Sequence, residues 1–186
     1  MDLKNAVYGR RAVRDYASDP VNDEIVQNLI SAAIQAPSAM NQQLWAFTVV
    51  RDQTLLDRIS RESKAYMLGN APAGSVPSHL SAMLHNPDFH IFYHAPVLIV
   101  ITATADGPWI VEDCALAAQN LMLSAFAQGL GSCWIGFAQK WLGTPDGKAA
   151  LGIPAAHVPV APIIIGRPKA PAPAIPRKAP DIRWLR

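Results

Sequence analysis

Apolar residues recur at helical spacing along three stretches of the chain, and each stretch predicts a helix with one buried face. Asn22 and Asp52 stand where their side-chain oxygens can accept hydrogen bonds from first-turn amides, so we expect them to cap two of these helices. The residue before a proline avoids helical geometry, so Pro37 should end the first of the two at Ala36. The predicted amphipathic helices span residues 3–10, 22–36 and 52–64, and a further short helix is expected over residues 145–151.

Three other stretches predict strands. Residues 45–50 and 157–165 are rich in β-branched and aromatic side chains, and residues 95–103 form a continuous apolar run. A run without polar alternation is typical of a strand buried on both faces, so we expect residues 95–103 at the centre of a sheet. Pro159 and Pro162 cannot donate to a ladder, which predicts a free or bulged edge for the last strand.

A long helix is predicted over residues 109–128, where apolar residues occupy nearly all sides. Such a helix must be buried all round, and a single domain of this size has limited means to surround it. A helix at the centre of a dimer is one explanation, and a core helix enclosed by its own chain is the other.

Hydrophobic periodicity is lost between residues 65 and 86, where Gly69, Pro72, Gly74 and Pro77 are scattered among serines. We therefore predict a loop here. Two interpretations remain open: a mobile loop on the substrate side, or an excursion of the surface without a role in binding. The aromatic-rich segment 89–94 that follows could cover a flat substrate.

Composition indicates one compact domain that associates with a partner. The chain has 186 residues, of which 51% are hydrophobic and only 16% charged, so part of the apolar surface is expected to be covered by another subunit. The formal net charge of +2 is too small for a general nucleic-acid-binding surface. The positive charge is concentrated instead, because nine of the 16 lysines and arginines lie in residues 1–14 and 168–186.

Cysteine usage and hydropathy predict the compartment. Cys114 and Cys133 are the only cysteines, which excludes a disulfide framework and favours a reducing environment. No apolar run is long enough to span a bilayer, and the first residues lack the pattern of a secretory signal. We therefore expect a soluble cytoplasmic protein with neither a membrane nor a nucleic acid as partner.

Three histidines, His85, His90 and His94, lie within ten residues and invite comparison with a metal site. Pro87 interrupts the segment, no glutamate accompanies the histidines, and their spacing matches no standard set of ligands. The sequence therefore predicts no metal.

A basic segment follows the first predicted helix. In an extended segment alternate residues share a face, so Arg10 and Arg14 should point to one side and Arg11 to the other. Two guanidinium groups on one face suit a phosphate, whose oxygens they can bind in a bidentate manner. Taken alone, the segment is equally compatible with a solvated basic turn.

Two further segments could contact a ligand, one through polar side chains and the other through main-chain atoms at glycines. Residues 37–45 place a hydroxyl and several amides beside the apolar wall of Trp45 and Phe47, an arrangement that suits a planar ligand with polar edges, although an ordinary polar loop has the same composition. Gly129 and Gly131 can end the long helix in left-handed geometry, and Gly136 permits close approach of a flat ring to the main chain.

Read together, these three segments resemble the FMN-dependent nitroreductase family. The matching segments are Arg10-Arg-Ala-Val-Arg14, the P-S-x-x-N-x-Q-x-W pattern from Pro37 to Trp45, and Gly129-Leu-Gly-Ser-Cys-Trp-Ile-Gly-Phe137. The match extends from Arg10 to about Lys178, apart from residues 66–92. The resemblance implies an α+β fold with a central, mainly antiparallel sheet flanked by helices. It also implies an intertwined homodimer of single FMN-binding domains covering residues 1–186.

The resemblance also assigns roles to individual residues. Arg10 would hold the FMN phosphate, Arg14 would lie beside the pyrimidine ring, and the backbone of Ile135 and Gly136 would face flavin N5 and O4. Two departures from the family pattern are Ala12, where serine is usual, and Leu44, where proline is usual. The complete set of implied cofactor-binding residues is Arg10, Arg11, Ala12, Arg14, Pro37, Ser38, Ala39, Asn41, Ile135, Gly136, Arg177 and Lys178.

The tail from about residue 167 to 186 is proline-rich and basic, and cannot form a core of its own. By resemblance it would wrap the partner subunit and bring Arg177 or Lys178 onto the cofactor phosphate. Without the resemblance, a disordered basic tail is an equal alternative.

The implied activity is the reduction of nitroaromatics, quinones or similar electron-poor small molecules by NAD(P)H, through ping-pong transfer of hydride at flavin N5. No side chain need act as a catalytic acid or base. Relatives with another reaction, such as reductive dehalogenation or flavin fragmentation, and a non-catalytic FMN-binding protein are the alternatives. The sequence identifies neither the natural acceptor nor the choice between NADH and NADPH.

Overall fold

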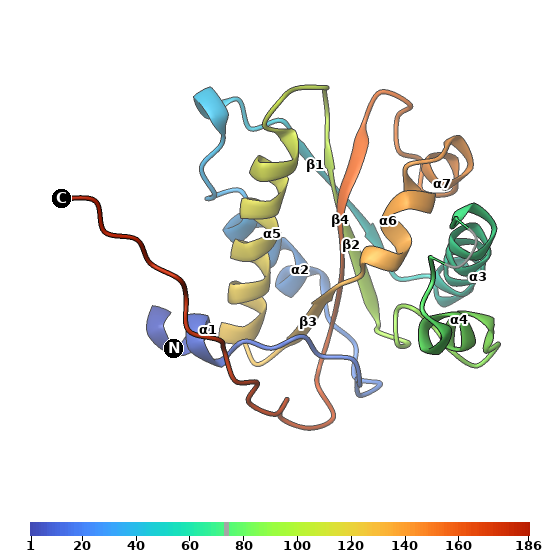
Figure 1. Ribbon diagram of the computed structural model, residues 1–186, viewed down its shortest axis with the longest axis horizontal. Coiled ribbons are helices and arrows are strands. Elements are labelled where there is room, and N and C mark those ends of the chain that lie inside the picture. Colours follow the sequence, from blue (N-terminus) through green and yellow to red (C-terminus); the bar gives the residue numbers. More distant parts are fainter. Residues whose placement is uncertain (73–74) are drawn as a thin grey trace.

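The computed structural model describes residues 1–72 and 75–186. At its centre is a four-stranded sheet in the order β1-β2-β4-β3, in which every neighbouring pair is antiparallel (Figure 1). The strands are β1 (Trp45–Val50), β2 (Val97–Ala103), β3 (Gly131–Trp134) and β4 (Val158–Gly166). The expected α+β architecture with an antiparallel sheet is confirmed.

Helices cover both faces of this sheet (Figure 1). Helices α2 and α5 pack together against one face, and α3 and α6 pack against the other. Side chains of β2 alternate between the two cores, with Ile99 and Ile101 facing α2 and α5 and with Leu98 and Val100 on the opposite side. The helices are α1 (Leu3–Gly9), α2 (Asp23–Ala33), the 3-10 helix η1 (Ala39–Asn41), α3 (Gln53–Asn70), α4 (Ser78–His85), α5 (Ile110–Ala127), α6 (Gly136–Leu142) and α7 (Pro145–Ala150).

The predicted caps and the central strand are confirmed. The side chains of Asn22 and Asp52 accept hydrogen bonds from first-turn amides of α2 and α3. All seven residues of β2 are buried. Helix α2 ends at Ala33 instead of Ala36, because the amides of Gln35 and Ala36 bond to carbonyls only three residues back and tighten the turn.

The prediction of a loop over residues 65–86 is wrong. Helix α3 continues to Asn70, and α4 occupies Ser78–His85. Gly69 is tolerated in the last turn of α3, and Pro77 stands at the N-cap of α4, where no helical amide is lost. Residues 73–74 of the predicted loop lie outside the described residues.

One side of helix α5 is open in the single chain, so the alternative of a core helix enclosed by its own chain is wrong and the dimer helix stays a prediction. Cys114 and Leu121 are fully buried against the sheet and α2, whereas Val111 and Leu116 are 52% and 45% exposed. An apolar face that the chain itself does not cover remains available to a partner.

Strand β4 accommodates its two prolines with a bulge. Pro159 and Pro162 lie in an interior strand that pairs with β2 on one edge and β3 on the other. The register shifts between Ile101 and Thr102 of β2, which leaves Val160 without a partner there. The bulge is therefore confirmed. The edge that faces β3 is unpaired at Pro159, because β3 pairs with residues 163–166 only.

The chain after β4 contains one isolated bridge, between Pro168 and Tyr16, and then extends away from the body of the molecule (Figure 1). Its apolar side chains are exposed; they are Ile175, Ile182, Trp184 and Leu185. None of the described helices is long and apolar enough to cross a membrane.

A pair of glycine substitutions tests the packing of α6 against α7. A Cβ at Gly147 would come within 2.1 Å of the Trp141 carbonyl oxygen, whereas a Cβ at Gly69 would meet nothing within 4 Å. We expect Gly147→Ala to lower the free energy of unfolding by about 3 kcal/mol, because the added methyl group would force the backbone at Trp141 to move. Gly69→Ala should stabilise it by about 0.5–1 kcal/mol. Denaturant unfolding of both variants measures the difference, and equal midpoints would contradict this packing.

Candidate functional site

The basic segment is held against the sheet by β3. The Val13 amide donates to the Ser132 carbonyl at 3.0 Å, and Ala12 forms a parallel bridge with Ser132. Gly131 makes this approach possible, since a Cβ there would lie 2.7 Å from the Val13 side chain. The segment therefore runs beside the strand that leads directly to residues 135 and 136.

The three arginines divide as expected. Arg10 and Arg14 both lie close enough to Cys133 to act on its thiol electrostatically. Arg11 turns back instead, and its Nη1 donates to the carbonyl oxygens of Tyr8 at 2.7 Å and of Arg10 at 2.8 Å. Arg10 and Arg14 thus share a side, and Arg11 is engaged by main-chain acceptors.

Positive charge is concentrated around Arg10. Burial lowers the pKa of the Arg10 guanidinium, and the nearby cations Arg177 and Arg11 lower it further. The charge on Arg10 is destabilised without a counter-charge, so this group of cations suits a bound anion. The tail thus brings Arg177 towards Arg10. Lys178 is not among the groups that act on Arg10.

The segment after β3 exposes main-chain atoms at Gly136. The Ile135 amide donates to the Pro162 carbonyl at 2.8 Å, so this N–H is used by the sheet. Gly136 is exposed and has open space where a Cβ would stand. Of the two backbone amides that the resemblance implies, the one at Gly136 is the one free of the sheet.

The turn at residues 37–41 lies at the other end of α5. The Ala39 amide donates to Asp113 Oδ1 at 3.0 Å in the first turn of α5, whereas Gly9 lies against Phe126 in its last turn. Thirteen residues of helix at 1.5 Å each separate these contacts by about 20 Å. One chain therefore does not bring Pro37, Ser38, Ala39 and Asn41 to the basic segment (Figure 1).

The same turn has unusual backbone geometry. Met40, Asn41 and Gln43 have φ values of 52°, 55° and 53°, in the left-handed region. The Ser38 hydroxyl accepts from the Gln43 amide at 3.0 Å and closes the turn. Asn41 is exposed, so the turn presents its side chain to the surroundings of the chain.

Two buried side chains that lie near Arg14, those of Cys133 and Tyr16, are protonated. Burial raises the pKa of the Cys133 thiol, although Arg14 and Arg10 oppose the rise. Burial likewise raises the pKa of Tyr16, whose hydroxyl donates to the Val13 carbonyl at 2.6 Å. A protonated, buried thiol is a poor nucleophile, so Cys133 acts as a packed side chain.

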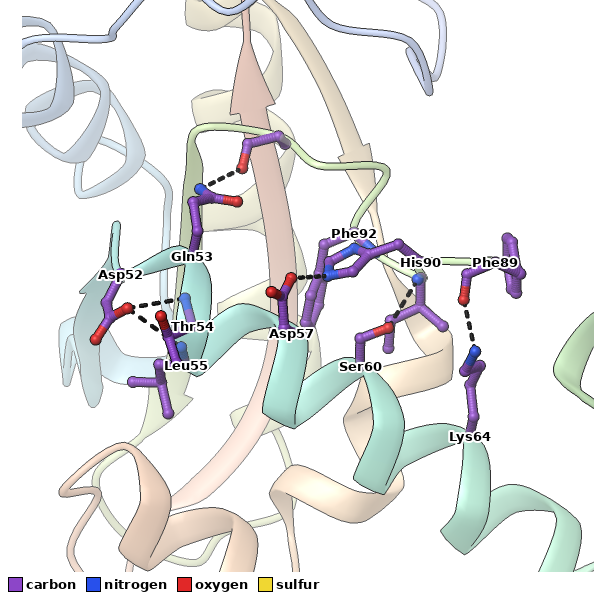
Figure 2. Close-up of polar contacts among 12 residues, drawn as sticks. Asp52, Gln53, Thr54, Leu55, Asp57, Ser60, Lys64, Phe89, His90 and Phe92 are labelled. Carbon is purple, nitrogen blue, oxygen red and sulfur yellow. Dashed lines mark hydrogen bonds and ion pairs between the residues drawn. The ribbon is translucent and has the colours of Figure 1, made fainter. Parts of the chain in front are cut away.

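Histidines gather with a carboxylate near the site, which their spacing did not predict. The ligand atoms of Asp57, His90 and His94 lie within 4.8 Å of one another. Figure 2 shows Asp57 of α3 meeting the His90 ring, with Nε2 and Oδ1 3.1 Å apart. The Phe92 amide donates to His90 Nδ1 at 3.2 Å, which places the ring proton on Nε2.

This tautomer determines what the cluster can do. Burial and His94 lower the pKa of His90, while Asp57 acts in the opposite direction. A neutral ring with its proton on Nε2 donates that hydrogen to Asp57. The pair therefore connects α3 to the segment that carries Tyr93, which lies beside Arg14.

Tyr93 belongs to the aromatic segment 89–94, but the sequence did not predict that it lies beside Arg14. It lines a cavity of about 270 Å³ together with Arg14 and Tyr16. Burial raises the pKa of its hydroxyl, and Arg14 opposes the rise. Tyr93 has a φ of 52°, in the left-handed region that a bulky residue rarely adopts. The local sequence gives no signal for this conformation.

Comparison with known proteins matches this geometry to one family. The model of the nitroreductase family matches residues 7–167. A protein of Archaeoglobus fulgidus with the provisional name NADH dehydrogenase/NAD(P)H nitroreductase is 31% identical over 164 residues, which cover 88% of this chain and 83% of that protein.

Solved structures agree. A Bacteroides fragilis nitroreductase with bound FMN superposes with a TM-score of 0.86 at 26% identity, and a Desulfitobacterium hafniense nitroreductase with bound FMN superposes with a TM-score of 0.80 at 26% identity. Both comparisons cover 100% of each chain. The fold, the order of the three segments and these matches together show that the chain belongs to the nitroreductase family.

Proposed function

We propose that two copies of this chain bind FMN between them and use NAD(P)H to reduce a small electron-poor molecule such as a nitroaromatic or a quinone. The observation that carries the proposal is that a strained arginine cluster lies at the segment paired with β3, the strand that leads to an exposed backbone amide. Arg10 and Arg177 provide the cluster, and Gly136 provides the amide, at the end of the strand that pairs with the basic segment.

The residues present fit FMN in charge and shape. A phosphate would relieve the mutual repulsion of Arg10 and Arg177, which is what lowers the Arg10 pKa after burial. A flat ring can approach Gly136 without meeting a side chain. When bound, FMN accepts hydride from NAD(P)H and passes two electrons to the acceptor.

The chain's own residues orient the cofactor and stabilise charge. Arg14 lies beside the expected position of the pyrimidine ring, where its cation offsets the negative charge that reduction adds. The Gly136 amide would donate towards the reacting edge of the ring. Burial raises the pKa of the Cys133 thiol and of the Tyr16 hydroxyl, so both stay protonated and neither adds a negative charge near Arg14.

The separation of the two predicted halves of the site supports the proposed dimer. About 20 Å of helix divides the turn at residues 37–41 from the basic segment, so the turn would meet the basic segment of the partner subunit. Exposed apolar side chains on α1, on α5 and in the tail provide a surface for association. They are Met1, Leu3, Val7, Tyr8, Trp109, Val111, Leu116, Ile175, Ile182, Trp184 and Leu185.

A spectroscopic experiment tests the function. We expect the purified protein, after incubation with FMN and removal of excess, to hold one FMN per chain with a flavin absorption band. NADH or NADPH should bleach this band without oxygen, and a quinone or nitroaromatic should restore it. Parallel lines in double-reciprocal rate plots should follow, because both substrates use one site in turn.

Two results would count against the proposal. Failure to retain FMN would remove the cofactor, and a bound flavin that neither nicotinamide bleaches would indicate a binding protein instead of an enzyme.

A further inference from the structure

A small cavity opens beside Gly136, between the C-terminal end of α3 and helix α6. Its volume is about 250 Å³, and Tyr66, Met67 and Asn70 line it from α3 while Gly136 and Phe137 line it from α6. Because Gly136 is the residue expected to face the flavin, a molecule in this cavity would lie next to the flavin ring. The cavity is therefore placed to receive the electron acceptor.

One wall of the cavity is aromatic and firmly supported. The rings of Phe137 and Phe89 pack edge-to-face with their centroids 6.4 Å apart. The rings of Phe89 and Tyr93 pack in the same way with their centroids 5.8 Å apart. The ammonium of Lys64 donates to the Phe89 carbonyl oxygen at 2.7 Å (Figure 2) and to the Asn86 carbonyl oxygen at 2.9 Å. These two bonds fix the segment that carries Phe89. A rigid aromatic wall favours a flat aromatic ligand.

The charge of the cavity has one sign. Lys140 lies four residues after Gly136, one turn along α6, and lines the same cavity. The other lining residues are apolar or carry neutral amide and hydroxyl groups, and no carboxylate is among them. Within residues 1–72 and 75–186, no acidic side chain forms an ion pair with Lys140.

We propose that this cavity selects single-ring aromatic acceptors that carry a carboxylate, and that Lys140 is the residue that determines this preference. The inference rests on the proposed function. The volume of about 250 Å³ lies below the roughly 300–1,000 Å³ of sites for larger ligands, which favours one ring over two. The ammonium of Lys140 attracts an anionic substituent, and the aromatic wall packs against the ring.

The reaction with a nitrobenzoate is balanced as follows. The reduced flavin gives up two electrons and is oxidised. The nitro group takes up these two electrons and two protons, is reduced to a nitroso group, and releases one oxygen as water. The carboxylate takes no part in the chemistry, so it can serve as the group by which the acceptor is held.

The test compares 4-nitrobenzoate with its neutral counterpart 4-nitrobenzamide. Holoenzyme is reduced with dithionite, and the reoxidation rate constant is measured for each acceptor, so that nicotinamide binding plays no part. We expect Lys140→Gln to lower the ratio of the two rate constants about three- to fivefold, the size expected of one exposed charge. Lys140→Glu should lower it further, because attraction becomes repulsion.

Arg58→Gln is the matched control. It also removes one positive charge from the surface, but Arg58 lines a different cavity, beside Asp146. The ratio in this variant should equal that of the native protein. An unchanged ratio in both Lys140 variants, or an equal fall in the Arg58 variant, would overturn the assignment of Lys140.

Benzoate titration of the oxidised holoenzyme, followed by the flavin spectrum, gives a readout that does not depend on turnover. We expect Lys140→Gln to weaken benzoate binding by a similar factor. If neither nitro compound reoxidises the flavin while Lys140 still determines benzoate affinity, the proposed reaction fails and the anion site stands. If benzoate binds equally to both proteins, the anion site fails.

Discussion

Replacing Arg10 with alanine is expected to weaken FMN binding at least about tenfold, the scale of a lost charge-assisted hydrogen bond. Arg10 belongs to the strained cluster, whereas Arg11 already donates to two carbonyl oxygens and faces away. Arg11→Ala should therefore change the affinity by no more than about twofold. Fluorescence titration of FMN with each apoprotein gives the two dissociation constants.

The effect of Arg10→Ala on folding should differ in sign from its effect on binding. Neighbouring cations and burial depress the pKa of Arg10, which means that its charge is destabilised in the protein without a ligand. Removing it should leave the melting temperature of the apoprotein unchanged or raise it. Equal losses of FMN affinity in both variants would refute the assignment of faces.

Replacing Asn41 with aspartate is expected to weaken FMN binding about tenfold. The turn that carries Asn41 and the basic segment of the same chain contact opposite ends of α5, about 20 Å apart. The change removes an amide donor and adds a negative charge at the proposed flavin edge. Aspartate tolerates the left-handed backbone that residue 41 adopts, with φ of 55°, so the turn should persist.

Gln42→Glu is the matched control for this variant. It makes the same amide-to-acid change one residue further on, at another exposed position with ordinary helical geometry. Its FMN affinity should stay near that of the native protein. If Gln42→Glu weakens binding as much as Asn41→Asp, charge in the general neighbourhood accounts for the effect, and Asn41 has no specific role.

Local signals in the sequence predicted most of the fold. Asn22 and Asp52 cap their helices through atoms a few residues away, and the apolar run in β2 follows from burial on both faces. The segment around Gly69 and Pro77 was misassigned because these residues were interpreted as breakers of structure. Each stands at a helix end, where neither disrupts the hydrogen bonding.

The candidate site was harder to predict, because its parts meet only through tertiary structure. The pattern of alternate faces correctly separated Arg10 from Arg11, since it depends on backbone geometry alone. Strand β3 was missed, as four residues are too few for a clear period, and so was the use of the Ile135 amide by the sheet. Lys140 could have been found from its spacing of four residues from Gly136.

The central claim is that each FMN lies between the basic segment of one subunit and the turn at residues 37–41 of the other. Co-expression of Arg10→Ala and Asn41→Asp chains with different affinity tags, followed by purification through both tags, isolates the mixed dimer. Both substitutions should then fall in one site and leave the other native. We predict that each mixed dimer has one site that binds FMN with native affinity, and that every site in the two parent homodimers binds FMN about tenfold or more weakly. A mixed dimer without any site of native affinity would contradict the claim.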